Sequence, residues 1–208
     1  MELTKENYHS LEASKYYMSR GQFNDFLECE AKAMAILNGE WKEEETTALL
    51  VGRYVHAWNE GTLEELKDSC PQMFKKDGSL KAEFVQAEKM IETLQNDPLV
   101  MHTLTGEKER IFTAKLFGVP WKVMIDVHVP GKRNVDIKTT KSIRDYHWVE
   151  ALNGKVSFIE EYHYLRQAAL YSEIERIANG REEGDWLPFY SVVVSKEKVP
   201  DKEIIEFN

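Results

Sequence analysis

The spacing of the apolar residues changes near residue 109, and this change restricts the folds that the chain can adopt. Before residue 109, apolar side chains recur at helical intervals in three segments: residues 19–37, 45–59 and 81–95. Ser19 is expected to cap the first helix, and Asn38-Gly39 to end it. The residues from 66 to 80 contain Pro71 and the turn pair Asp77-Gly78, so a loop is expected there.

From residue 109 onward the pattern alternates between apolar and polar side chains, and β-branched and aromatic residues become frequent. We expect three strands here, at residues 109–117, 120–129 and 133–139. A long helix and two short strands are expected to follow, at residues 156–179, 188–195 and 203–207. This order of elements predicts an α+β or mixed α/β fold around a central sheet.

Length and composition narrow the class of protein. A chain of 208 residues fits one domain, with a mainly helical part over 1–100 and a sheet core over 101–208. The two cysteines, Cys29 and Cys70, are too few for a four-thiolate zinc or iron–sulfur site. The sequence has no apolar run of roughly 18 residues and no signal peptide at its start. We therefore expect a reduced cytoplasmic protein that does not use a membrane.

The most informative segment is a predicted hairpin that turns at Pro130-Gly131-Lys132. If the hairpin is symmetric about Gly131, Val127 lies opposite Val135. Ile125 lies opposite Ile137 in the same way, so one face of the two strands is apolar.

The same register places Asp126, Asp136 and Lys138 on the other face, with Asp126 directly opposite Asp136. Two carboxylates roughly 5 Å apart on neighbouring strands repel each other unless a cation lies between them or one stays protonated. Oxygen ligands suit Mg²⁺ or Mn²⁺. Lys138 could hold a phosphate oxygen or orient a water molecule, so the group predicts metal-assisted phosphodiester hydrolysis. The alternative is an exposed face on which these side chains are only solvated.

Two further pairs share a helical spacing of four residues, which puts both members of a pair on one face. Gly52-x-x-x-His56 would allow another backbone to come close and would present an imidazole ligand. Gln167-x-x-x-Tyr171 could hydrogen-bond a DNA backbone or a substrate phosphate. The alternatives are a solvated histidine and a helix face that packs on the sheet.

Charge is distributed unevenly along the chain. The net charge is −9, but residues 110–155 hold nine Lys and Arg against four acids, which makes this segment +5 and the remainder −14. A local basic surface on an acidic protein is what binding to a polyanion requires, although chance clustering is the alternative. Glu107 and Glu109 precede this segment, and either could add a carboxylate to the site.

Taken in order, these motifs resemble the PD-(D/E)XK nuclease superfamily in its RecB/RecE-like branch. The set consists of Gly52-x-x-x-His56, Glu109, Asp126, Asp136-x-Lys138 and Gln167-x-x-x-Tyr171. The segments Ser19-Arg20-Gly21-Gln22-Phe23, Cys29-Glu30-Ala31 and Gly52-Arg53-Tyr54-Val55-His56 resemble the RecE-like exonucleases of phages and prophages more narrowly. The resemblance covers about residues 8–180.

The resemblance implies a restriction-endonuclease-like core, a mixed sheet flanked by helices with an N-terminal helical region. It implies metal ligation by His56, Asp126, Asp136 and the carbonyl of Ile137, with Glu109 and Lys138 as further catalytic residues. Supporting or DNA-binding roles fall to Gln167, Tyr171, Lys141 and Arg144. Asp136 stands where many superfamily members have Glu, and the iron–sulfur subgroup is excluded because it needs four cysteines.

The same resemblance implies Mg²⁺-dependent digestion of linear double-stranded DNA in the 5′-to-3′ direction, with Mn²⁺ as a possible substitute. It further implies a single-strand annealing protein as partner, recombination of the phage type, and a homo-oligomeric ring around DNA.

Two other functions compete with this one. A nuclease-fold module could bind DNA or a partner without cutting, but the intact Asp126, Asp136 and Lys138 count against it. An acidic interaction protein is disfavoured by the basic segment around the acid pair. The sequence contains no nucleophile elbow, phosphate-binding loop, zincin or dinucleotide-binding motif.

Overall fold

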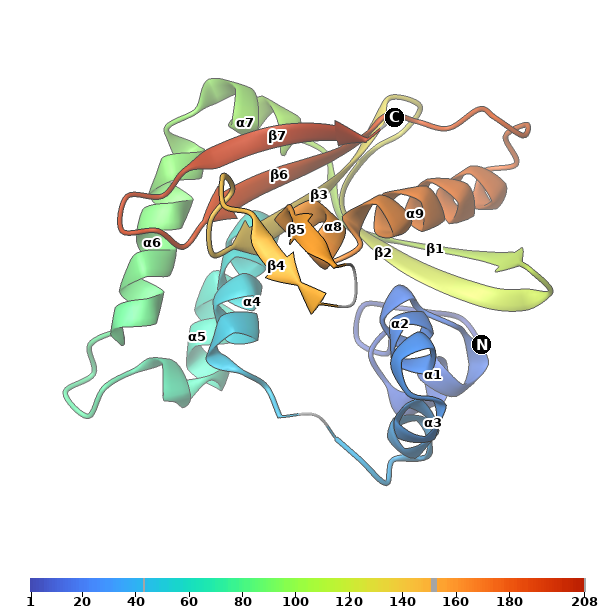
Figure 1. The fold of residues 1–208 in the computed structure, drawn as a ribbon, viewed down its shortest axis with the longest axis horizontal. Coiled ribbons are helices and arrows are strands. Elements are labelled where there is room, and N and C mark those ends of the chain that lie inside the picture. The colour runs from blue at the N-terminus through green and yellow to red at the C-terminus, as the bar shows by residue number, and fades with distance from the viewer. Residues whose placement is uncertain (43, 151–152, 208) are drawn as a thin grey trace.

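Five strands form one mixed sheet at the centre of the molecule: β1 (Glu107–Leu116), β2 (Val119–Val129), β3 (Arg133–Thr140), β6 (Phe189–Ser195) and β7 (Lys202–Phe207) (Figure 1). They lie side by side in that order, with β3 and β6 parallel and all other neighbours antiparallel. A separate antiparallel pair consists of β4 (His147–Val149) and β5 (Gly154–Val156). The structure is a computed structural model that describes residues 1–42, 44–150 and 153–207.

The helices gather in the first half of the chain and after β5. They are α1 (Leu11–Tyr16), α2 (Arg20–Glu28), α3 (Glu30–Asn38), α4 (Thr47–Glu60), α5 (Leu63–Ser69), the 3-10 helix η1 (Pro71–Met73), α6 (Ala82–Gln95), α7 (Pro98–Thr103), α8 (Phe158–Glu161) and α9 (Tyr164–Ala178). Helices α1–α3 lie together beside the β1–β2 hairpin, away from α4–α7 (Figure 1). Over the described ranges, no helix combines the length and the apolar character needed to cross a membrane.

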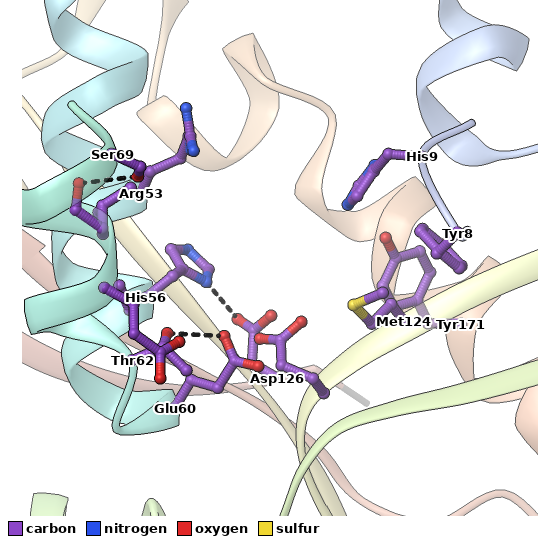
Figure 2. Close-up of a pocket in the computed structure, with 14 residues that line it drawn as sticks. Tyr8, His9, Arg53, His56, Glu60, Thr62, Ser69, Met124, Asp126 and Tyr171 are labelled. Atoms are coloured by element: carbon purple, nitrogen blue, oxygen red, sulfur yellow. Dashed lines mark hydrogen bonds and ion pairs between the residues drawn. The ribbon is translucent and has the colours of Figure 1, made fainter. Parts of the chain in front are cut away.

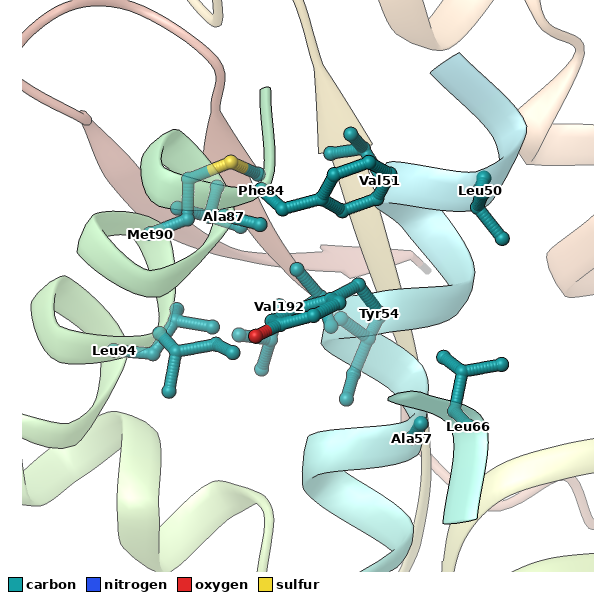
Figure 3. Packing of buried hydrophobic residues seen from close by; sticks show 14 of the residues in the cluster. Leu50, Val51, Tyr54, Ala57, Leu66, Phe84, Ala87, Met90, Leu94 and Val192 are labelled. Atoms are coloured by element: carbon teal, nitrogen blue, oxygen red, sulfur yellow. The ribbon is translucent and has the colours of Figure 1, made fainter. Parts of the chain in front are cut away.

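One face of the sheet is covered by α4 and α6, and the main apolar core lies between them. Tyr54 of α4 and Phe84 and Leu94 of α6 are almost fully buried (Figure 3). They belong to one cluster with Ile137 of β3 and Val192 of β6. This packing fixes α4, and therefore His56, relative to the middle strands.

The opposite face carries α9 and the N-terminal helices. Ile174 of α9 packs with Phe112, Val123 and Ile125 in a second cluster. A mixed sheet between two helical layers confirms the predicted fold class. It also places α4 and α9 on opposite sides of β3, the strand that carries Asp136.

Several predicted elements are confirmed, and three are wrong in detail. The helix expected over 19–37 is two helices, because the backbone at Cys29 is extended and lets α3 fold back against α2. The helix expected over 156–179 is interrupted at His163, which has a left-handed backbone with φ of 55°. The loop expected over 66–80 contains the end of α5 and the η1 turn. The short elements α1, α7, β4 and β5 were not predicted.

Candidate active site

The β2–β3 hairpin has the predicted register near its turn but not further along. Val127 pairs with Val135 and Val129 pairs with Arg133, as symmetry about Gly131 requires. The ladder ends there, so Asp126 and Asp136 are not paired across the strands. Instead, the Asp126 carboxylate Oδ2 accepts a hydrogen bond of 2.6 Å from the Ile137 amide.

At this hydrogen bond, the side chains of β2 change the side of the sheet to which they point. Val127 lies in the core under α4 and α6, whereas Ile125 packs with Ile174 of α9 on the other side of the sheet. The prediction that Ile125 shares an apolar face with Val127 and Ile137 is therefore wrong. The Asp126 carboxylate takes the place that a backbone carbonyl would have in the ladder, and the alternation shifts at that residue.

The neighbouring strand is distorted at the same level. Lys108 and Arg110 of β1 pair with Val127 and Ile125, which leaves Glu109 beside Asp126. Glu109 has a φ of 54°, in the left-handed region that non-glycine residues rarely adopt. Strained backbone of this kind concentrates at functional sites, and here it accompanies a carboxylate that reaches the acid site.

Three side chains from different elements meet at this point. The ligand atoms of His56, Glu109 and Asp126 all lie within 4.8 Å of one another. His56 Nδ1 is 3.4 Å from Asp126 Oδ2 (Figure 2). Glu107, the competing acid, instead forms an ion pair with Arg110. The structure thus brings Glu109 rather than Glu107 to the site.

The Gly52-x-x-x-His56 motif lies on α4 next to β3. His56 reaches the acid cluster from this helix, as its spacing predicts. Gly52 does not serve a tight approach of backbones, because a Cβ there would lie 3.6 Å from the Thr139 hydroxyl, an ordinary contact. The predicted steric reason for this glycine is therefore wrong.

Asp136 and Lys138 lie on the α9 side of β3, as alternation predicts. Lys138 Nζ is 2.7 Å from Asp136 Oδ2 and 4.9 Å from the centre of the Tyr164 ring. Gln167 donates a hydrogen bond of 2.7 Å to Asp136 Oδ1. Tyr171, one turn further along α9, lines the neighbouring cleft. Gln167 therefore contacts the acid site directly, and Tyr171 lines the cleft beside it.

The charges of the site are strongly coupled. Burial alone would raise the pKa of Asp126, but His56 and Lys138 outweigh it and hold that pKa below the ordinary value. Burial raises the pKa of Asp136 against the pull of Lys138. Burial and the Asp126 charge raise the pKa of Glu109 to about 7. Burial alone would lower the pKa of His56, but the charge of Asp126 and its contact with the imidazole outweigh it and raise that pKa to about 9.

The donor set fits a divalent cation. Two carboxylates and an imidazole suit Mn²⁺, and the carboxylates also suit Mg²⁺. Ligand atoms around Mg²⁺ lie at most about 4.2 Å apart, so a group within 4.8 Å needs only a small contraction. Gln167 Oε1 is buried without a hydrogen bond, as expected of an oxygen that awaits a further partner, whereas Asp136 Oδ2 is already engaged by Lys138 Nζ at 2.7 Å. Ligand roles for Asp136 and the Ile137 carbonyl stay predictions.

A cleft of about 710 Å³ opens onto the cluster and is lined by His56, Glu109 and Asp126. Figure 2 shows Tyr8, His9, Met124 and Tyr171 on the side of Asp126 that faces away from α4. Tyr8 and His9 were not predicted as site residues, because no spacing or motif connects them to the acids.

The two predicted DNA-binding cations, Lys141 and Arg144, are exposed outside this cleft. Arg144 forms ion pairs with Asp201 and Glu203, the first preceding β7 and the second within it. The structure therefore does not bring these two residues into the acid cluster, and their contact with DNA stays a prediction.

Comparison with known proteins agrees with this geometry. Residues 19–208 match the model of a family described as a PDDEXK-like domain of unknown function (DUF3799). The chain belongs to this family. The PDDEXK-like domain is also similar to a chain of known crystal structure from Eubacterium rectale, described as a "Putative exonuclease", with 41% identity and a TM-score of 0.93. That match covers 100% of this chain and 79% of the other. No curated protein gave a significant match.

These similarities confirm the nuclease-superfamily resemblance at the level of the PDDEXK-like fold. They also relate the chain to a protein described as an exonuclease. The narrower RecE-like assignment stays a prediction.

Proposed function

We propose that this PDDEXK-like domain is a metal-dependent exodeoxyribonuclease that hydrolyses linear double-stranded DNA. The observation that carries the proposal is the convergence of His56, Glu109 and Asp126 beside the Asp136–Lys138 pair. A purely structural acid cluster would have no need for a strained backbone at Glu109 or for a buried Gln167 oxygen without a hydrogen bond.

Each residue has a task that follows from its position. His56, Glu109 and Asp126 would hold Mg²⁺ or Mn²⁺, with Asp136 and the Ile137 carbonyl as further candidate ligands. A cation bound there would supply positive charge for the phosphate and acidify a water. The Ile137 amide keeps the Asp126 carboxylate fixed, so that its other oxygen would be available to a cation.

Lys138 is held between the Asp136 carboxylate and the Tyr164 ring, so its ammonium group has a defined position. From there it can stabilise negative charge that develops on the phosphate, or orient the attacking water. Gln167 fixes the Asp136 carboxylate through the bond to Oδ1. Asp136 can then hold Lys138 without rotating.

The finer features of the proposal rest on the resemblance to RecE-like exonucleases. They are 5′-to-3′ polarity, action at duplex ends, a homo-oligomeric ring, a single-strand annealing partner and phage-type recombination in the cytoplasm.

The test uses linear duplex DNA labelled at the 5′ or the 3′ end, incubated with Mg²⁺, with Mn²⁺ or with a chelator. We expect metal-dependent loss of duplex, early release of the 5′ label, and no attack on covalently closed circles. Asp126→Asn should abolish cleavage, whereas Asp145→Asn, an exposed acid of the same basic segment, should not.

Two results would count against the proposal. Linearisation of a closed circle would indicate an endonuclease. Binding of duplex DNA without any cleavage in either metal would support the non-catalytic module instead.

A further inference from the structure

The first 18 residues precede the part of the chain that matches the family, yet they are tied to its catalytic sheet. Met18 forms a parallel bridge with Trp121 of β2, and its carbonyl accepts a 2.9 Å hydrogen bond from the Lys122 amide. Lys5 forms an ion pair of 2.9 Å with Glu60 at the end of α4. This segment is therefore attached on both sides of the cleft, to α4 and to β2.

Lys122 fixes the middle of the segment. Its side-chain amine donates hydrogen bonds to the Tyr8 carbonyl at 2.6 Å and to the Ser14 hydroxyl at 3.4 Å. It also lies 4.8 Å from the centre of the Tyr8 ring. Lys122 is only 3% exposed and has no carboxylate partner among the described residues, and its burial lowers its pKa to about 8. Burying a lone ammonium group is unfavourable, and the contacts that it makes here all hold residues 8–14 in place.

The result is a tyrosine in a fixed position at the acid cluster. Tyr8 is 7% exposed and lines the cleft with Glu109, Asp126 and Tyr171. Its hydroxyl makes no hydrogen bond to any residue that the structure describes. Burial and the Glu109 charge raise the pKa of Tyr8, so the phenol keeps its proton and can only gain by donating it to an acceptor.

The DNA substrate can supply a hydrogen-bond acceptor for the Tyr8 hydroxyl. Phosphate oxygens of DNA accept hydrogen bonds, and the carboxylates nearby would be engaged by the cation. A neutral donor suits this place, because a lysine or arginine would compete with the cation for Glu109 and Asp126. The Tyr8 side chain lies on the side of Asp126 opposite His56, across the cleft that both residues line (Figure 2).

We propose that Tyr8 is a substrate-contacting residue of the nuclease site, which donates a hydrogen bond to a phosphate oxygen of the DNA strand at the His56–Glu109–Asp126 cluster. Lys122 is its positioning residue. The inference rests on the proposed nuclease function, and it adds to the family's domain a segment that lies outside the matched residues.

The experiment compares Tyr8→Phe, Lys122→Met and the double variant with the wild type. Tyr16→Phe is the control, because Tyr16 belongs to the same segment and is 54% exposed. Three quantities are measured: kcat/KM for linear duplex in Mg²⁺, affinity for a duplex end by fluorescence anisotropy in Ca²⁺, and Mg²⁺ affinity by calorimetry.

We expect Tyr8→Phe to lower kcat/KM by about tenfold, the effect of one lost hydrogen-bond donor, with Mg²⁺ affinity unchanged. Lys122→Met should lower it at least as far, and the double variant no further, because both changes remove the same contact. Tyr16→Phe should match the wild type.

Equal cleavage and equal duplex affinity for Tyr8→Phe and the wild type would overturn the assignment of Tyr8. A wild-type protein that binds Mg²⁺ but does not cut DNA would instead overturn the proposed function. In that case the anisotropy measurement in Ca²⁺ still decides whether Tyr8 contacts the duplex.

Discussion

Glu109 should destabilise the metal-free protein, and replacing it with glutamine should make the protein more stable. The carboxylate is half-buried beside Asp126, and Asp126 and burial together raise its pKa to about 7. The unfolded chain would release this proton near the ordinary value of 4.5. Between these two values the folded state binds more protons than the unfolded state, so its stability falls as the pH rises.

The size of the effect follows from the two pKa values. The difference between about 7 and 4.5 corresponds to about 3 kcal/mol at alkaline pH. Partial exposure of Glu109 to solvent lowers this to about 2 kcal/mol. For a domain of this size, about 2 kcal/mol raises the melting temperature by about 4 to 8 °C.

Thermal unfolding of the wild type and Glu109→Gln in a chelator measures this directly. At pH 8 the variant should melt about 4 to 8 °C higher, and at pH 4.5 the two should coincide. Adding Mg²⁺ should reverse the order at pH 8, because the ion stabilises the folded wild type by mass action and the variant lacks one ligand.

Glu109→Gly separates charge from backbone strain. It removes the carboxylate and also relieves the left-handed backbone, which costs roughly 1–2 kcal/mol for a non-glycine residue. Glu109→Gly should therefore be more stable than Glu109→Gln at every pH. The difference in stability is smaller than the relieved strain, because glycine loses more conformational entropy on folding. A melting difference between the wild type and Glu109→Gln that is the same at pH 4.5 and pH 8 would refute the reasoning.

Three further predictions concern single residues. Asp126→Ala should lower the stability of the metal-free protein by about 1–3 kcal/mol in urea unfolding, because the Ile137 amide loses its acceptor. Asp126→Asn should keep most of the wild-type stability, because its side-chain oxygen can still accept this hydrogen bond. Lys138→Ala should lower the turnover number by at least about 100-fold with Mg²⁺ affinity near wild type, and Lys138→Arg should not rescue it; near-normal cleavage would contradict its assigned role. Gly106→Ala should destabilise the fold by about 1–3 kcal/mol, because a Cβ there would come within 2.8 Å of a backbone carbonyl, whereas Gly52→Ala should be neutral or stabilising.

Much of the fold could be predicted because its signals are local. Helix α6 and strand β3 each follow one hydrophobic period, and the residues of α6 and of β1–β3 lie within one or two positions of the expected bounds. The register about Gly131 was predictable because a short turn sets the pairing beside it. The interrupted helices were not predictable, since the breaks at Cys29 and His163 carry no proline or glycine.

The candidate site was predictable where alternation or helical spacing decides which way a side chain points. That is true of Asp136, Lys138 and Gln167, which contact one another, and of His56, which reaches Asp126. Alternation could not choose between Glu107 and Glu109, because both have the same parity along the strand.

The choice between the two glutamates depends on a left-handed backbone at Glu109 that no local pattern indicates. Tyr8 could not be predicted as a site residue for another reason: Lys122, which holds it in place, is 114 residues away in the sequence.

The hydrogen bond from the Ile137 amide to Asp126 makes one backbone proton a reporter of the site. In a sheet ladder this proton would face a neutral carbonyl, and its nuclear magnetic resonance frequency would reflect only backbone geometry. Here it faces a carboxylate, so its chemical shift should depend on the charge of Asp126. Protonation of the acid or arrival of a cation draws electron density away from the oxygen that this amide contacts. The Ile137 amide signal therefore reports the protonation of Asp126 and the binding of a cation, without any DNA present.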